Sequence, residues 1–104
     1  MRVLVLGVND IASAVGWLLW RHGQEVLFSS EPAPTVTRRL MAFADAVFDG
    51  RAALEGVIAQ RVVTPAEAEA LLSARTAIPL FVGQPWTELI TALRPSVLVD
   101  ARMR

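Results

Sequence analysis

The residues with the clearest chemical potential lie in a turn that follows an apolar run at residues 3–6. A Rossmann-type phosphate site uses one glycine for a tight turn, a second where the backbone approaches the phosphates, and a third small residue where the helix meets the strand. Here Gly7, Asn9 and Ala12 hold these positions. Asn9 tolerates left-handed backbone, but its side chain takes up space that a phosphate would use. The turn therefore predicts a phosphate site with one departure from the usual pattern.

Asp10 and Ile11 extend this predicted site into the first helix. The start of a helix presents free backbone N–H groups and the positive end of its dipole to an anion. Asp10 competes with such an anion, because a carboxylate at this position can cap the same N–H groups. We predict ligand binding at Gly7, Asn9, Asp10 and Ile11, and the alternative interpretation of Asp10 is a helix cap alone.

A second group of candidate residues follows the second predicted strand. Ser30 and Glu31 come at about the position where Rossmann domains place a ribose-binding acid, roughly 20 residues after the glycine turn. Arg38 and Arg39 lie farther along the chain and, together with the serine, favour a 2′-phosphate; the alternative is a solvated helix face. These residues leave the choice between NAD and NADP open.

Asp100 is the best single acidic candidate in the C-terminal part of the chain. It ends the last predicted strand, on the edge where open α/β sheets bind ligands, although a turn residue is an equally good interpretation. The one histidine, His22, is expected to end a helix, and the chain has no cysteine. We therefore predict no protein-bound metal and no complete catalytic constellation, so the protein is not expected to be a complete enzyme.

The bulk composition excludes several classes of protein. Ten basic residues balance ten acidic ones, so no net field attracts nucleic acid or anionic lipid. No apolar run approaches the length of a membrane span, and Met1 leads directly into a strand rather than a signal peptide. We expect a cytoplasmic protein with neither nucleic acid nor a membrane as its partner.

The pattern of apolar residues predicts one small Rossmann-like α/β domain over residues 1–104. Its sheet is expected to be mostly parallel and flanked by helices, with a β-hairpin insertion at residues 52–62 around Glu55 and Gly56. Thr64, Pro65 and Glu67 form a strong helix start. The predicted strands cover residues 3–6, 25–29, 46–48, 78–82 and 96–100, and the main predicted helices cover 10–21, 64–73 and 86–93.

The first helix carries two tryptophans that predict a contact surface. Helical spacing places Trp17 and Trp20 on the side away from the sheet, next to the small residues Ser13 and Gly16. Exposed indoles usually mark an interface, so we predict a homodimer through Trp17 and Trp20; the alternative is cover by the C-terminal segment of the same chain. The sheet is then covered by the opposite face of the helix, formed by Ile11, Val15, Leu18 and Leu19.

Four stretches, spread in order over nearly the whole chain, resemble a bacterial family: the accessory proteins of selenium-dependent molybdenum hydroxylase systems, related to the xanthine dehydrogenase accessory factors. The stretches are Gly7-Val8-Asn9-Asp10-Ile11-Ala12-Ser13, Pro34-Thr35-Val36-Thr37-Arg38-Arg39, Phe43-Ala44-Asp45-Ala46-Val47-Phe48-Asp49-Gly50 and Val97-Leu98-Val99-Asp100-Ala101. The resemblance implies a Rossmann-like domain that helps mature or insert the molybdenum cofactor of a hydroxylase such as xanthine dehydrogenase. The motif positions that it implies are Gly7, Asp10, Ser13, Arg38, Arg39 and Asp100.

Three functional hypotheses follow. The first is an accessory protein for a molybdenum hydroxylase that binds a nucleotide or another cofactor. The second is an NAD(P)-dependent oxidoreductase domain, for which no proton donor is evident. The third is a degenerate Rossmann domain that dimerises and binds no ligand. The expected ligand is NAD(P) or another small molecule that bears a phosphate.

Overall fold

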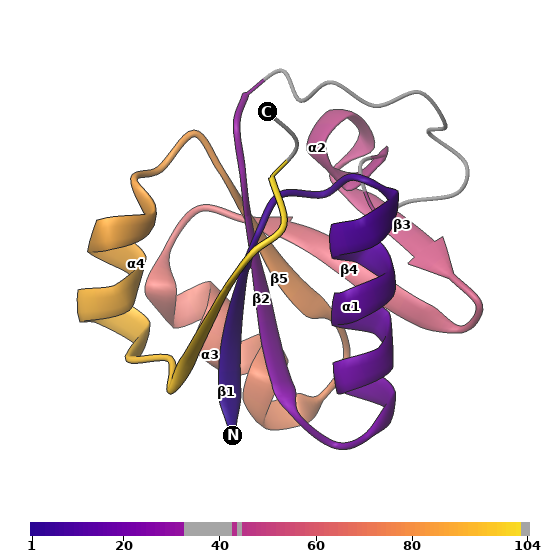
Figure 1. Ribbon diagram of the computed structural model, residues 1–104, viewed down its shortest axis with the longest axis horizontal. Helices are drawn as coiled ribbons and strands as arrows, with labels where there is room; N and C mark the ends of the chain where they lie inside the picture. Colours follow the sequence, from indigo (N-terminus) through magenta and orange to yellow (C-terminus); the bar gives the residue numbers. More distant parts are fainter. Residues whose placement is uncertain (33–42, 44, 103–104) are drawn as a thin grey trace.

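A computed structural model describes residues 1–32, 43 and 45–102, and it contains a six-stranded sheet with helices on both faces (Figure 1). The strand order is β3-β4-β5-β2-β1-β6, and every neighbouring pair is parallel except the antiparallel pair β3–β4. α1 covers one face, and α3 and α4 cover the other (Figure 1). The predicted α/β class is confirmed, and the architecture is compatible with a small Rossmann-like fold. The strands are β1 Arg2–Leu6, β2 Glu25–Ser30, β3 Arg51–Leu54, β4 Val57–Val62, β5 Ile78–Val82 and β6 Val97–Asp100, and the helices are α1 Asp10–Arg21, α2 Asp45–Asp49, α3 Pro65–Ala74 and α4 Trp86–Leu93.

The centre of the sheet consists of strands that are buried on both faces. β1 and β2 are buried along almost their whole length, as expected of parallel strands between two layers of helices. Val5 and Phe28 lie opposite each other in the β1–β2 ladder, and both are fully buried. The core is thus built around the β1–α1–β2 unit that the sequence predicts.

The predicted orientation of α1 is wrong. Ala12, Ser13, Gly16 and Trp20 are buried, whereas Ile11 and Leu18 are exposed. The ring of Phe28 lies directly under Gly16, where an added Cβ would come within 2.3 Å of its Cζ atom. Small residues let the helix backbone approach the sheet closely, so the face of α1 that carries Gly16 packs against the sheet. Trp20 lies on the same face and is buried with it.

The surroundings of the two tryptophans differ from those expected of a free indole surface. Trp20 is buried, and the guanidinium of Arg75 lies 4.1 Å from the centre of its ring. Trp17 is half-buried, and the guanidinium of Arg21 lies 5.0 Å from its ring centre. The idea that both indoles face solvent is therefore contradicted, and they offer no support for a dimer through this surface.

The strand predicted at residues 46–48 is also wrong, because this segment lies in the short helix α2. The N–H of Ala46 donates to the carbonyl of Phe43, and the N–H of Gly50 donates to the carbonyl of Ala46. Ala46 and Val47 are buried while Phe48 is exposed. A run of three apolar residues fits one turn of helix as well as it fits a strand, so the pattern alone could not decide.

The predictions for the middle of the chain are confirmed. β3 and β4 form a hairpin whose turn residues, Glu55 and Gly56, both have positive φ angles of 46° and 84°. Thr64 caps α3 by accepting from the N–H of Glu67, and the Glu67 side chain accepts from the N–H of Thr64. Both features depend on residues close together in the sequence.

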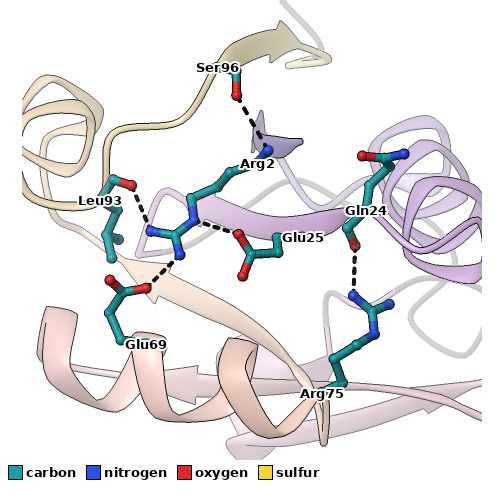
Figure 2. Close-up of polar contacts among 7 residues, drawn as sticks. All are labelled: Arg2, Gln24, Glu25, Glu69, Arg75, Leu93 and Ser96. Atoms are coloured by element: carbon teal, nitrogen blue, oxygen red, sulfur yellow. Dashed lines mark hydrogen bonds and ion pairs between the residues drawn. The ribbon is translucent and has the colours of Figure 1, made fainter.

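Arg2 ties four elements together at the amino edge of the sheet (Figure 2). Its guanidinium lies 3.1 Å from a carboxylate oxygen of Glu25 in β2, 2.6 Å from one of Glu69 in α3 and 2.7 Å from the carbonyl oxygen of Leu93 in α4. Burial acts to lower the pKa of Arg2, but its hydrogen bonds and attraction to the two carboxylates outweigh this and raise it. Arg2 is therefore a cation at neutral pH.

Arg75 makes a second connection at the same edge. It ends α3 in the left-handed conformation and donates to the carbonyl oxygens of Trp20 and Gln24, at 2.8 and 3.1 Å. The end of α3 is thereby joined to the end of α1, from the opposite face of the sheet.

In the part of the chain that the structure describes, no helix is long and apolar enough to cross a bilayer.

Candidate ligand-binding site

The turn after β1 requires a glycine at its first position. Gly7 has a φ of 109°, and its N–H donates to the carbonyl of Ser29 at 2.8 Å. A Cβ built on Gly7 would lie 3.3 Å from the carbonyl oxygen of Ala101. The backbone conformation strains any residue with a Cβ at this position, and the close approach of the segment after β6 leaves little room for one. The predicted tight turn is present.

Asn9, and not Asp10, is the residue that caps α1. Its Oδ1 accepts from the N–H of Ala12 at 2.9 Å, and its Nδ2 donates to the carbonyl of Ala101 at 2.6 Å. Asp10 is the exposed first residue of the helix. The residue predicted as the possible cap, Asp10, is therefore one position too late. Asn9 has an extended backbone, from which its side chain reaches the N–H three positions ahead. One N–H that an anion could use is occupied by Asn9 itself.

A cavity of about 300 Å³ lies beside this turn, at the carboxyl ends of β1, β2 and β5. The chain leaves β2 toward β3 and leaves the neighbouring strand β5 toward β6, so the two connections run in opposite directions across the sheet at this point. Open α/β sheets bind their ligands at such a point. The cavity is lined by Leu6, Gly7, Val8, Asn9, Ser29, Ser30, Glu31, Pro32, Gly83, Gln84, Pro85, Trp86 and Arg102.

The structure brings four of the predicted binding residues together around the cavity: Gly7, Asn9, Ser30 and Glu31. Asp10, Ile11 and Asp100 are not part of its lining, and the side chains of all three are exposed. Arg38 and Arg39 lie outside the described residues. Ser30 is buried, and its hydroxyl donates to the carbonyl of Glu31 at 2.9 Å.

Asp100 does not line the cavity, but it accepts hydrogen bonds from Arg102, a residue that does. The guanidinium of Arg102, which lines the cavity, donates to both carboxylate oxygens of Asp100, at 2.9 and 2.7 Å. The hydrogen bonds to Asp100 raise the pKa of Arg102, and the charge of Glu31 acts in the same direction. Among the described residues that line the cavity, Glu31 and Arg102 are the charged ones. A ligand phosphate would share Arg102 with Asp100.

The wall of the cavity formed by the loop after β5 was not predicted from the sequence. Residues 83–86 connect β5 to α4 and supply Gly83 and Trp86 to the lining. The N–H of Gly83 donates to the carbonyl of Ser30 at 2.8 Å, which holds this loop against the end of β2. One feature of the sequence could have predicted it. Gly83 follows a predicted parallel strand, as Gly7 does, and the two glycines must therefore lie at the same edge of the sheet.

Comparison with known proteins reveals one informative similarity. The chain is similar to YqeB of Escherichia coli K12. The two are 41% identical over 99 residues, which is 95% of this chain and 18% of YqeB, an uncharacterized protein. The chain thus spans about a fifth of the length of the relative it matches. No family model and no solved structure matches.

The described residues contain no group of three or more His, Asp or Glu side chains suited to hold a metal ion. The arrangement can instead enclose a small organic ligand. It offers polar groups at the end of β2, one arginine and a partly exposed indole.

Proposed function

We propose that the cavity binds a nucleotide or a related phosphate-bearing cofactor, and that the protein is a cytoplasmic accessory protein for the maturation of a molybdenum hydroxylase such as xanthine dehydrogenase. The observation that carries the ligand site is the cavity at the carboxyl edge, next to the glycine turn after β1. The hydroxylase part rests on the resemblance of the four sequence stretches, and it is a separate claim with a separate test.

The volume of the cavity favours a compact ligand. About 300 Å³ is at the lower end of the range of roughly 300–1,000 Å³ found for ligand pockets. This space suits one heteroaromatic ring with a sugar or a phosphate better than an extended dinucleotide. We therefore expect a mononucleotide-sized ligand to bind more tightly than NAD or NADP.

The lining residues support distinct roles in binding. Trp86 at the start of α4 offers an aromatic surface for a ring, and Pro32 and Pro85 add rigid apolar walls. Arg102 supplies positive charge for a phosphate. Glu31 can accept hydrogen bonds from the N–H or O–H groups of a ligand.

The ligand proposal is tested by thermal shift and calorimetry with AMP, NAD, NADP and inorganic phosphate. A ligand that binds only the folded state raises the midpoint of unfolding, and AMP is expected to do so most. Trp86→Ala should weaken AMP binding about tenfold, the size of a lost stacking contact of roughly 1–1.5 kcal/mol, while the matched variant Trp86→Phe should retain most of it. Gly7 is unsuitable for this test, because its positive φ means that a substitution disturbs the fold as well as the site.

Three outcomes contradict parts of the proposal. If none of the compounds stabilises the protein, the domain is a ligand-free scaffold. If NADP binds most tightly and supports hydride transfer, the oxidoreductase hypothesis is preferred. If the protein does not bind a purified molybdenum hydroxylase that lacks its cofactor, the accessory role is wrong even when AMP binds.

A further inference from the structure

The side chain of Ser29 is a buried polar group beside the cavity. The residue is 9% exposed and belongs to the lining. Among the described residues its hydroxyl has no hydrogen-bond partner, whereas the hydroxyl of Ser30 is bonded to the carbonyl of Glu31. Buried polar groups nearly always have a partner, so the hydroxyl of Ser29 is available to a molecule in the cavity.

Ser29 faces the side of the sheet that α4 covers. The neighbouring residue Phe28 faces α1, because its ring lies under Gly16. Successive side chains of a strand point to opposite faces, so Ser29 points to the face of α3 and α4 (Figure 1). The hydroxyl without a partner thus lies on the same face as α4.

The start of α4 has no side-chain cap. The N-cap position is held by Pro85, whose side chain accepts no hydrogen bond. The N–H groups of Trp86 and Thr87 come first in the helix and have no partner among the described residues. Pro85 and Trp86 line the cavity, whereas Glu88, the acidic residue of the first turn, is exposed and lies outside the lining. The positive end of this helix therefore borders the cavity.

The start of α1 is less suited to an anion. Asn9 already accepts from the N–H of Ala12, and Asp10 places a carboxylate at the first position of the helix. Neither Asp10 nor Ile11 lines the cavity. The two helix starts at this edge of the sheet thus differ, because α1 carries its own cap and a negative charge.

The loop before α4 is held in place by bonds to two strands. The N–H of Gly83 donates to the carbonyl of Ser30 at 2.8 Å, at the end of β2. The side-chain amide of Gln84 donates to the carbonyl of Val63 at 2.7 Å, just after β4. The start of α4 is therefore positioned without help from a ligand, which lowers the cost of binding one.

We propose that the phosphate of the ligand binds at the start of α4 and not at the glycine turn after β1. The N–H groups of Trp86 and Thr87 and the hydroxyl of Ser29 donate to it, and Arg102 adds positive charge from the lining. This inference rests on the proposed ligand site and reverses the orientation that the turn after the first strand predicts. The ligand group is a phosphate, carried by a nucleotide or present as the free ion.

The first test compares the two helix starts. Thr87 and Ile11 are the second residues of α4 and α1, and both are exposed. Thr87→Asp places a carboxylate at the proposed phosphate site and should weaken binding of AMP about tenfold, whereas the matched variant Ile11→Asp should weaken it by about twofold at most. An acidic residue in the first turn favours a helix, so neither variant should lower the midpoint of thermal unfolding through this position.

Calorimetry with AMP, adenosine and inorganic phosphate measures these changes. AMP should bind the wild-type chain more tightly than adenosine does, and Thr87→Asp should remove this difference. If Ile11→Asp weakens AMP binding as much as Thr87→Asp does, the phosphate lies at α1, and this inference is wrong while the ligand proposal stands. Equal affinity of the wild-type chain for AMP and adenosine also overturns it.

Two further outcomes separate the inference from the ligand proposal. Inorganic phosphate that binds the wild-type chain but not Thr87→Asp, without any binding of AMP, would support the site at α4 and contradict a nucleotide ligand. If none of the three compounds binds, both proposals are wrong.

The second test concerns the hydroxyl of Ser29. Ser29→Ala should weaken binding of AMP about fivefold and leave that of adenosine nearly unchanged, because the hydrogen bond lost is one to the phosphate. In the matched variant Ser30→Ala, any change should be shared by AMP and adenosine, since this hydroxyl is bonded to the carbonyl of Glu31 and faces α1. An unchanged ratio of the two affinities in Ser29→Ala would contradict the contact between Ser29 and the phosphate.

Discussion

Arginine residues make different kinds of contact at the amino edge and at the carboxyl edge of the sheet, that is, at the two ends of its parallel strands. At the amino edge, Arg2 bonds to β2, α3 and α4, and Arg75 at the end of α3 bonds to Gln24, just after α1 (Figure 2). Arg75 also bonds to Trp20 within α1. At the carboxyl edge, Arg102 bonds to Asp100, only two residues away. At the amino edge, arginine therefore links elements that are distant in the sequence. At the carboxyl edge, Arg102 forms a local pair beside the cavity.

This difference separates stability from binding. An arginine that joins several elements contributes to the free energy of unfolding, because its loss leaves carbonyls and carboxylates without their donor. An arginine in an exposed local pair contributes little, since water replaces its partner. Replacing each of the three arginines by methionine tests this comparison, because methionine keeps a long flexible stem and removes the charge and the donors.

Arg2→Met should have the largest effect on stability. The side chain is 19% exposed and makes three polar contacts, two of them with carboxylates that are 37% and 51% exposed. Allowing for the solvent around those carboxylates, we expect a loss of about 2 kcal/mol in the free energy of unfolding. Urea denaturation measures this loss. A change no larger than that of Arg102→Met would remove the distinction between the edges.

Arg75→Met should have an intermediate effect. It removes two hydrogen bonds and the cation–π contact with Trp20, while the stem still covers the indole. The expected loss is about 1 kcal/mol. Tryptophan fluorescence should also shift, because the ring of Trp20 loses its charged neighbour. Unchanged fluorescence together with unchanged stability would show that this link is dispensable.

Arg102→Met should leave the free energy of unfolding unchanged within error, because its pair with Asp100 is local and exposed. It should nevertheless weaken binding of AMP several-fold, since Arg102 is the basic residue among the described lining of the cavity. Calorimetry measures the binding and urea denaturation the stability. Full AMP affinity in this variant would show that the phosphate does not contact Arg102.

The sequence predicted those parts of the fold that depend on neighbouring residues. The capping box of Thr64 and Glu67 and the turn at Glu55 and Gly56 are local, and both are present. The orientation of α1 depends on Phe28, which lies under Gly16 in the folded chain but twelve residues away in the sequence. Counting large apolar residues could not reveal that a small face packs most closely on the sheet.

The candidate site was predictable to the extent that one rule applied. Gly7, Asn9, Ser30 and Glu31 were identified because ligands bind at the carboxyl ends of parallel strands. The same rule applied to β5 identifies Gly83 and Trp86. Arg102 could not be assigned in this way, because its side chain is turned toward the cavity by a bond to Asp100 that no pattern in the sequence indicates.

The two bonds of the Asn9 side chain have a consequence for communication along the chain. One amide group holds both the start of α1 and the carbonyl of Ala101, so a guest molecule that displaced it would remove one of the two bonds that hold Ala101, leaving the bond from its N–H to the carbonyl of Leu6. Occupancy near the N-terminus would then be transmitted to the opposite terminus.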